Sequence, residues 1–328
     1  MDRRLVSIVL VFYLGVLSVS VAVEAQDGAE ERIVFVSSGP GFLTALYFTD
    51  VYGRSLRHII GNPIEAHNIR HPAWSPDGQW VAFSDNVKNG PAIYIVHPDG
   101  SKLRKLTPEL AYFTPSWSPD GERMAIGNGS DSQIYLLDVR TKKTTQWTFE
   151  GRHNLRPDWS PDGKRIAFDS TRGGGNFDIY VRDVDDVGSL RRLTHPRGGR
   201  RGNRFSPKWS PDGQMIAFSA SGWDADTGAD IYVMDADGGN VRRITTHPSI
   251  DGDPSWLPGG KGLVFVSDRD GKRMLYRIDL DGKNLQRLAE GVEPDVWNTR
   301  PLAISPFGSR PSPFGRLLMW GWIKKSIR

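Results

Sequence analysis

An arginine-rich segment is the part of this sequence best suited to binding a charged ligand. Arg197, Arg200, Arg201 and Arg204 place four guanidinium groups within eight residues. A guanidinium group can bind a carboxylate or a phosphate through two parallel hydrogen bonds. The segment therefore predicts a site for an acidic ligand, and the alternative is a solvated loop without a ligand.

A second basic group lies earlier in the sequence. It consists of Arg152, His153, Arg156 and Arg172. If the fold brings these residues next to the Arg197–Arg204 segment, one side of the site becomes strongly basic. Bidentate binding of acidic sugars or acidic side chains is the chemistry that such a surface offers.

The evidence for a metal site or a cofactor is weaker. Asp224, Asp226 and Asp230 resemble the start of a calcium-binding loop, but the glutamate expected at the twelfth loop position is missing. A solvated insertion is the alternative for this segment. The seven histidines show no paired spacing of metal ligands. No cofactor is therefore expected.

Signals of catalysis and of nucleic-acid binding are also weak. The sequence has no Gly-x-Ser-x-Gly motif, which would place a nucleophilic serine on a strand-to-helix turn. The formal net charge is only +4, from 42 basic and 38 acidic residues. We therefore expect a protein without catalysis that does not bind nucleic acid.

A repeat led by tryptophan predicts the elements that position these residues. Trp74, Trp117, Trp159, Trp209 and Trp256 are separated by 43, 42, 50 and 47 residues. After the first four comes Ser-Pro-Asp-Gly, and after the fifth comes Leu-Pro-Gly-Gly. A period in the forties with several short apolar runs is typical of a β-propeller built from four-stranded blades.

The chemistry of the repeat supports this interpretation. Ser-Pro-Asp-Gly suits a type I turn, because proline presets the second position and glycine fits the fourth. Runs such as 165–169, 178–183 and 191–194 are the expected second, third and fourth strands of one blade. The tryptophans are expected to fill the interfaces between blades, which is a structural role rather than a catalytic one.

The motifs Trp-Ser-Pro-Asp-Gly-x-x-Ile-Ala-Phe, Asp-Ile-Tyr-Val and Arg-Arg-Leu-Thr resemble the repeat of TolB-type propellers. Similar repeats occur in the propellers of prolyl-oligopeptidase-like peptidases and of oligogalacturonate lyases. The resemblance covers roughly residues 32–300 and implies an all-β propeller. It says more about fold than about function.

Six blades are expected, with the ring closed by a strand near the carboxyl terminus. The run 32–36 matches the second strand of a blade, with no tryptophan motif before it. Pro294-Asp295-Val296-Trp297 repeats the lead-in to the tryptophan without the turn that follows it. We therefore expect Pro294–Trp297 to complete the first blade beside Ile33–Val36, with Trp297 as the sixth structural tryptophan.

Segments outside the propeller suggest an exported protein. Residues 1–25 read as a signal peptide, with Arg3 and Arg4 before an apolar run and cleavage near Ala25, and an uncleaved anchor is the alternative. Residues 26–31 form a short linker, 32–300 the propeller and 301–328 a tail. The tail is apolar and then basic, which suits contact with a partner or a membrane surface, or packing onto the propeller. The expected location is the periplasm or the exterior.

Three functions remain open from the sequence. The first is a non-catalytic, monomeric propeller that binds a protein or another envelope component through the rim of its central channel. That rim comprises the loops before each first strand and those between second and third strands. The second is a lyase acting on acidic sugars with the basic residues on the same rim. The third is a structural module that docks through its tail.

Overall fold

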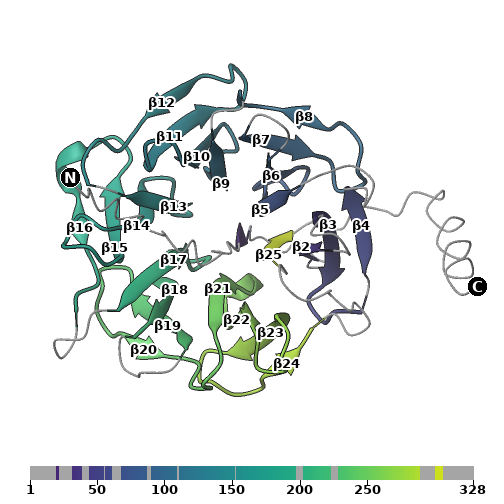
Figure 1. The fold of residues 1–328 in the computed structure, drawn as a ribbon, viewed down its shortest axis with the longest axis vertical. Coiled ribbons are helices and arrows are strands. Elements are labelled where there is room, and N and C mark those ends of the chain that lie inside the picture. Colours follow the sequence, from purple (N-terminus) through teal and green to yellow (C-terminus); the bar gives the residue numbers. More distant parts are fainter. Residues whose placement is uncertain are drawn as a thin grey trace, which may run out of the picture.

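The protein folds into six sheets arranged radially around one axis (Figure 1). In this computed structural model five sheets are blades of four antiparallel strands whose first strand lies nearest the axis, and the sixth has five strands, with β1 pairing parallel to β25. The predicted six-bladed all-β propeller is therefore confirmed. The structure describes residues 20–21, 32–38, 44–54, 56–60, 68–86, 90–108, 111–151, 153–196, 202–222, 228–288 and 300–305.

The first three blades contain strands β1 to β12 and β25. Blade 1 has the order β1 (Ser20–Val21), β25 (Arg300–Ser305), β2 (Arg32–Ser38), β3 (Thr44–Asp50) and β4 (Arg57–Ile60). Blade 2 consists of β5 (Ile69–Trp74), β6 (Val81–Asn86), β7 (Pro91–Val96) and β8 (Arg104–Lys105). Blade 3 consists of β9 (Tyr112–Trp117), β10 (Arg123–Asn128), β11 (Gln133–Asp138) and β12 (Thr144–Gln146).

The last three blades repeat this plan. Blade 4 consists of β13 (Asn154–Trp159), β14 (Arg165–Ser170), β15 (Asp178–Asp183) and β16 (Arg191–Arg192). Blade 5 consists of β17 (Asn203–Trp209), β18 (Met215–Ser221), β19 (Ala229–Asp235) and β20 (Arg242–Arg243). Blade 6 consists of β21 (Asp251–Trp256), β22 (Gly262–Ser267), β23 (Met274–Asp279) and β24 (Gln286–Arg287). Two short 3₁₀ helices, Val187–Ser189 and Pro258–Gly260, lie in connections.

Blade 1 combines segments from both ends of the described chain. Strand β25 pairs antiparallel with β2, so that Ile33 lies opposite Ile304 and Val36 opposite Arg300. A carboxyl-terminal strand therefore completes the blade as expected, but the predicted segment was wrong. The expected partner of Ile33–Val36, Pro294–Trp297, lies outside the described residues, and the actual partner comes later in the chain.

An aromatic pair links the second and third strands in five of the six blades. In blade 4, Phe168 lies opposite Tyr180 with 6.1 Å between the ring centroids. Matching pairs in blades 1, 2, 5 and 6 have centroids 5.7–5.9 Å apart. Directly opposed aromatic residues stabilise a sheet beyond their buried area. The repeated Phe and Tyr positions therefore help to set the strand register of each blade.

Apolar clusters fill the interfaces between neighbouring blades. Each of the five described motif tryptophans (Trp74, Trp117, Trp159, Trp209 and Trp256) packs in the cluster between its own blade and the preceding one. A further cluster joins Ile33 and Phe35 of blade 1 to Val264 and Val266 of blade 6. This last contact closes the ring with residues that are independent of β25. Closure removes the free sheet edges that an open arrangement would expose to other chains.

The Ser-Pro-Asp-Gly turns gather on one face of the ring, which we call the turn face. In blade 4 the Ser160 hydroxyl accepts the Arg165 amide proton at 2.9 Å, and the same bond recurs in blades 2, 3 and 5. Consecutive turns also touch: a Cβ placed on Gly213 would lie only 3.2 Å from the Pro161 side chain. The opposite face, where the first strands begin, is called the rim face. Within the described part of the chain, no helix has the length and apolarity needed to cross a membrane.

Loss of a tryptophan between blades should destabilise the whole ring. Trp256 is 1% exposed, and its indole N–H donates to the Lys208 carbonyl oxygen at 2.9 Å. We expect Trp256→Ala to lower the free energy of unfolding by about 3–5 kcal/mol, because it leaves a cavity and an unpaired carbonyl. Urea denaturation followed by circular dichroism measures this loss. Phe149, 65% exposed, supplies the control: Phe149→Ala should change stability by less than about 0.5 kcal/mol, and equal losses would contradict the assignment.

Candidate functional site

A β-bulge in the first strand of blades 2 to 6 carries one residue with left-handed backbone geometry. The strand register shifts at this point in blades 2 to 6. The residues concerned precede the proline of the tryptophan motif and have φ between 49° and 53°: His71, Thr114, Arg156, Ser206 and Asp253. We call these five residues the bulge ring.

The bulge ring combines a repeated backbone with different side chains. A bulge re-aims the side chain that it carries, and a non-glycine residue with positive φ is uncommon. Five such residues at equivalent positions are therefore a property of the blade design and not local irregularities. Arg156 was predicted as a ligand-binding residue from its charge, whereas Thr114 and Ser206 were not predicted. The signal that could have identified them is their shared place, directly before the repeated proline.

Polar contacts join the bulge ring across blades 4, 5 and 6. Arg156 donates from Nη1 to Asp169 Oδ2 at 2.7 Å, and the Ser206 amide donates to the same oxygen at 3.1 Å. The Ser206 hydroxyl donates to Asp253 Oδ1 at 2.8 Å, and the Asp253 amide donates to the Ser219 hydroxyl at 3.0 Å. The first strands of these blades are thus connected near the axis by hydrogen bonds as well as by apolar packing.

Asp169 is the buried charge at the centre of this network. Its side chain is fully buried, whereas the side chain of Arg156 is 11% exposed. Burial raises the pKa of the Asp169 carboxyl, while the Arg156 guanidinium and the Ser206 amide act in the opposite direction. Oδ1 of Asp169 has no hydrogen-bond partner within the described protein. The ion pair with Arg156 is therefore the main compensation for burying this carboxylate.

Aromatic rings surround Arg156 on the rim face. Its guanidinium lies 5.4 Å from the ring centre of Phe177 and 5.6 Å from that of Phe205. The exposed His153 ring lies 6.1 Å from the Phe177 ring. We call His153, Arg156, Phe177 and Phe205 the rim cluster. It offers a partner one exposed imidazole and two half-buried phenyl rings.

The other described basic candidates, Arg172 and Arg204, do not form the predicted open anion site. Arg172 is half-buried, donates to the Glu150 carbonyl oxygen at 2.9 Å and to Asn154 Oδ1 at 3.3 Å, and has its pKa lowered by burial. Arg204 is fully buried and pairs with Asp178, so its expected exposure in a ligand-binding loop was wrong. Its role is to neutralise a buried carboxylate. Arg152, Arg197, Arg200 and Arg201 lie outside the described residues.

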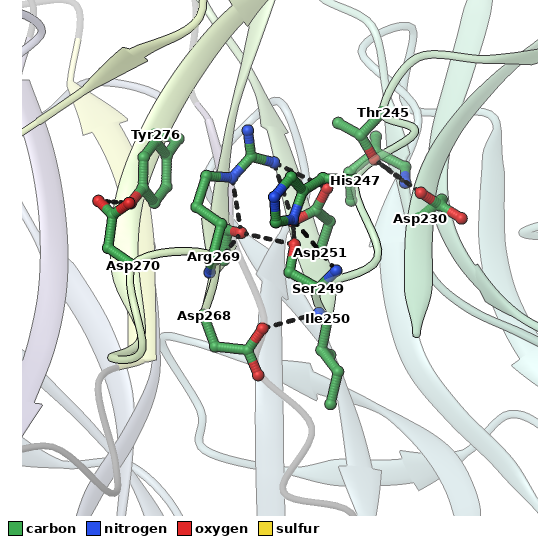
Figure 2. Close-up of polar contacts among 12 residues, drawn as sticks. Asp230, Thr245, His247, Ser249, Ile250, Asp251, Asp268, Arg269, Asp270 and Tyr276 are labelled. Carbon is green, nitrogen blue, oxygen red and sulfur yellow. Dashed lines mark hydrogen bonds and ion pairs between the residues drawn. The ribbon is translucent and has the colours of Figure 1, made fainter. Parts of the chain in front are cut away.

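A polar cluster on blades 5 and 6 fixes the segment that leads into β21 (Figure 2). Arg269 donates from Nη2 to both oxygens of the buried Asp251, at 3.1 and 2.9 Å, and from Nε to the Ser267 hydroxyl at 2.9 Å. The Ser249 hydroxyl donates to Asp251 Oδ1 at 3.0 Å. The Ile250 amide donates to Asp268 at 2.8 Å. These contacts tie the connecting segment to the rest of blade 6.

The calcium-site prediction receives no support from Asp230. Arg243 donates to Asp230 Oδ2 at 2.7 Å, and Thr245 donates to its other oxygen at 3.4 Å (Figure 2). An arginine in this position competes directly with a cation. Asp224 and Asp226 lie outside the described residues. Among the residues that are described, no group of three or more histidine, aspartate or glutamate side chains could hold a metal ion.

Removal of Arg156 should leave Asp169 as an unpaired buried charge. We expect Arg156→Ala to lower the free energy of unfolding by about 3–5 kcal/mol near neutral pH. The double variant Arg156→Ala/Asp169→Asn should recover most of this loss, because it removes the buried charge as well. Urea denaturation of the wild type, the two single variants Arg156→Ala and Asp169→Asn, and the double variant measures the coupling.

The pH dependence of the Arg156→Ala variant follows from the raised pKa of Asp169. A carboxyl that is protonated more readily in the folded than in the unfolded protein favours folding at low pH, and this contribution is lost as the pH rises. The stability deficit of the variant should therefore be smaller at about pH 5 than at about pH 8. A deficit independent of pH would contradict an unpaired carboxylate.

Comparison with known proteins places the chain in a family. The TolB β-propeller domain model matches residues 30–200 and 197–309. The chain is 47% identical over 53 residues to the Tol-Pal system protein TolB of Bordetella pertussis, covering 16% of this chain and 12% of that protein. It is 33% identical over 110 residues to the corresponding protein of Desulfosudis oleivorans, covering 33% of this chain and 24% of that protein. The matches thus span less than a quarter of these relatives.

Solved structures support the same assignment. TolB from Acinetobacter baumannii aligns with a TM-score of 0.71 and 25% identity, covering 84% of this chain and 66% of that one. An oligogalacturonate lyase in complex with manganese aligns with a TM-score of 0.58 and 16% identity, covering 86% of this chain and 80% of that one, which shows a shared fold alone. Because the family model extends over most of the propeller and the six blades follow its repeat, this chain belongs to the TolB β-propeller domain family.

Proposed function

We propose that this protein is a non-catalytic propeller of the bacterial cell envelope, acting within a Tol-Pal type system by binding another protein through its rim face. The observation that carries the proposal is the rim cluster, in which the exposed His153 ring lies beside the half-buried ring of Phe177. A rigid repeat whose loops differ from blade to blade suits recognition of a particular partner. Family membership supports the envelope system.

The rim cluster is the proposed contact point. His153 is exposed, and Phe177 and Phe205 are half-buried, so a partner could cover apolar area that already has a defined position. Aromatic residues and arginine dominate the binding energy of many protein interfaces. Arg156 serves this surface mainly by ordering it, since its charge is compensated by Asp169.

The proposed location is the periplasm, after removal of a signal peptide near Ala25. This agrees with the sequence pattern of residues 1–25 and with the envelope system named for the relatives. A monomeric state, and contact of the segment after β25 (306–328) with a partner or a membrane surface, remain parts of the same proposal. A chain without cysteine is compatible with an oxidising compartment, because it depends on no disulfide.

The alternative function is a lyase that acts on acidic sugars. Its support is the shared fold with an oligogalacturonate lyase. The described basic side chains do not favour it, because Arg156, Arg172 and Arg204 are each engaged by acceptors within the protein. Incubation with oligogalacturonate separates the two functions: we expect no rise in ultraviolet absorbance from an unsaturated product, and such a rise would favour the lyase.

Binding to the Pal component of the same bacterium tests the proposal directly. We expect the purified wild-type protein to bind Pal in isothermal titration calorimetry. His153→Ala should weaken binding about fivefold or more, because an exposed interface side chain is lost. Lys164→Ala is the matched control, since Lys164 is exposed on the turn face. Absence of binding by the wild type, or equal loss in both variants, would overturn the proposed site.

A further inference from the structure

A pocket on the turn face distinguishes the interface between blades 2 and 3 from the two interfaces that follow it. It has a volume of about 410 Å³ and lies between blades 2 and 3. Asp77 and Trp80 of blade 2 line it together with Trp117 and Asp120 of blade 3, and Arg104 of β8 lies at its edge. We call it the blade 2–3 pocket. Its volume lies within the range of pockets that bind small ligands or side chains.

In the next two interfaces, an arginine of the protein itself occupies the corresponding position. Arg123 of blade 3 lies over the Trp159 ring of blade 4, with 5.1 Å between the guanidinium carbon and the ring centre. Arg165 of blade 4 lies over the Trp209 ring of blade 5 at 4.6 Å, and also 3.9 Å from Asp162 of its own turn. A guanidinium group over the next tryptophan is therefore a repeated arrangement, and in blade 4 this group also lies near the turn aspartate. Cation–π attraction favours it.

Blade 2 carries Trp80 where blades 3 and 4 carry these arginines. The backbone is the same, since the Trp80 amide donates to the Ser75 hydroxyl at 2.9 Å, as the Arg123 amide does to Ser118. The Trp80 ring packs elsewhere, against Arg104 at 4.1 Å and against His97 at 4.7 Å. Asp77 and Trp117 thus retain the positions that elsewhere flank a guanidinium group, and here they line a pocket.

The charges of the pocket favour a cation. Its lining contains two carboxylates, Asp77 and Asp120, and one guanidinium, that of Arg104. Each turn uses Oδ1 of its aspartate, which accepts the Gln79 amide at 3.0 Å in blade 2 and the Glu122 amide at 2.9 Å in blade 3. The second oxygen of Asp77 can accept a hydrogen bond from an incoming donor, whereas Asp120 also interacts with the charge of Arg123 in its own blade. Trp117 supplies the ring face.

We propose that the blade 2–3 pocket binds the guanidinium or ammonium group of a basic side chain from a partner protein. The incoming group takes the place that Arg123 and Arg165 occupy in the following blades, between the carboxylate of Asp77 and the ring of Trp117. This site lies on the turn face and so is separate from the proposed contact surface on the rim face. The two sites could serve two partners at once.

Short peptides test the chemistry of the pocket. The probes are acetyl-Gly-Arg-Gly-amide, the lysine peptide and the citrulline peptide, in which a neutral urea replaces the guanidinium group. Saturation-transfer NMR with the full chain gives the relative affinities. We expect the citrulline peptide to bind about fivefold or more weakly than the arginine peptide, because it loses the cation–π and ionic contributions. Equal binding of the two would overturn the proposal.

Two variants and a control locate the binding. Trp80→Arg restores the residue type of blades 3 and 4, fills the pocket from within, and should reduce binding of the arginine peptide about tenfold or more. Asp77→Asn keeps the Oδ1 acceptor of the turn but removes the charge, and should also weaken binding. Asp162→Asn makes the same change in an occupied interface and should leave binding unchanged. Thermal unfolding confirms that each variant folds. Unchanged binding by Trp80→Arg, or equal loss in Asp162→Asn, would refute the site.

Discussion

The structure depends on the burial of both faces of every blade against its neighbours. Strands such as Val81–Asn86 and Gly262–Ser267 are almost entirely buried, so neither face of the sheet can be left in water. A ring is the arrangement that gives each blade two neighbours and leaves no end unpaired. The motif tryptophans fill these interfaces from one side, and the Phe–Tyr pairs help to hold five of the six sheets in register.

The local chemistry of the repeat made most of this architecture predictable. Ser-Pro-Asp-Gly defines a turn by itself, and the tryptophan before it defines where the first strand ends, so the order of strands in blades 2 to 6 followed directly. The closing strand could not be located in the same way. No turn connects it to β2, and pairing between distant segments is set by the whole ring and not by neighbouring residues. The resemblance of Pro294–Trp297 to the tryptophan motif therefore predicted the wrong closing segment, one that lies shortly before β25 in the chain.

The candidate site was harder to predict, because the state of a charged side chain depends on partners from other strands. Arg204 looked like part of an exposed basic loop, yet Asp178 of the preceding blade buries it. Asp230 looked like a calcium ligand until Arg243 was found beside it. Arg156 was selected for its charge, but its significance lies in the bulge that aims it towards Asp169. Spacing along the chain identifies such residues without revealing which charges they meet.

The pairing of β25 with β2 has a consequence for biogenesis. Strands β2 and β25, which are far apart in the sequence, must meet before blade 1 is complete, so a ribosome-bound chain keeps an open edge on blade 1 until β25 has emerged. Contacts so distant in sequence form slowly, and an open strand edge can pair with other chains in the meantime. A chaperone that shields Arg32–Ser38 until β25 is in place would therefore protect this protein at its most vulnerable stage.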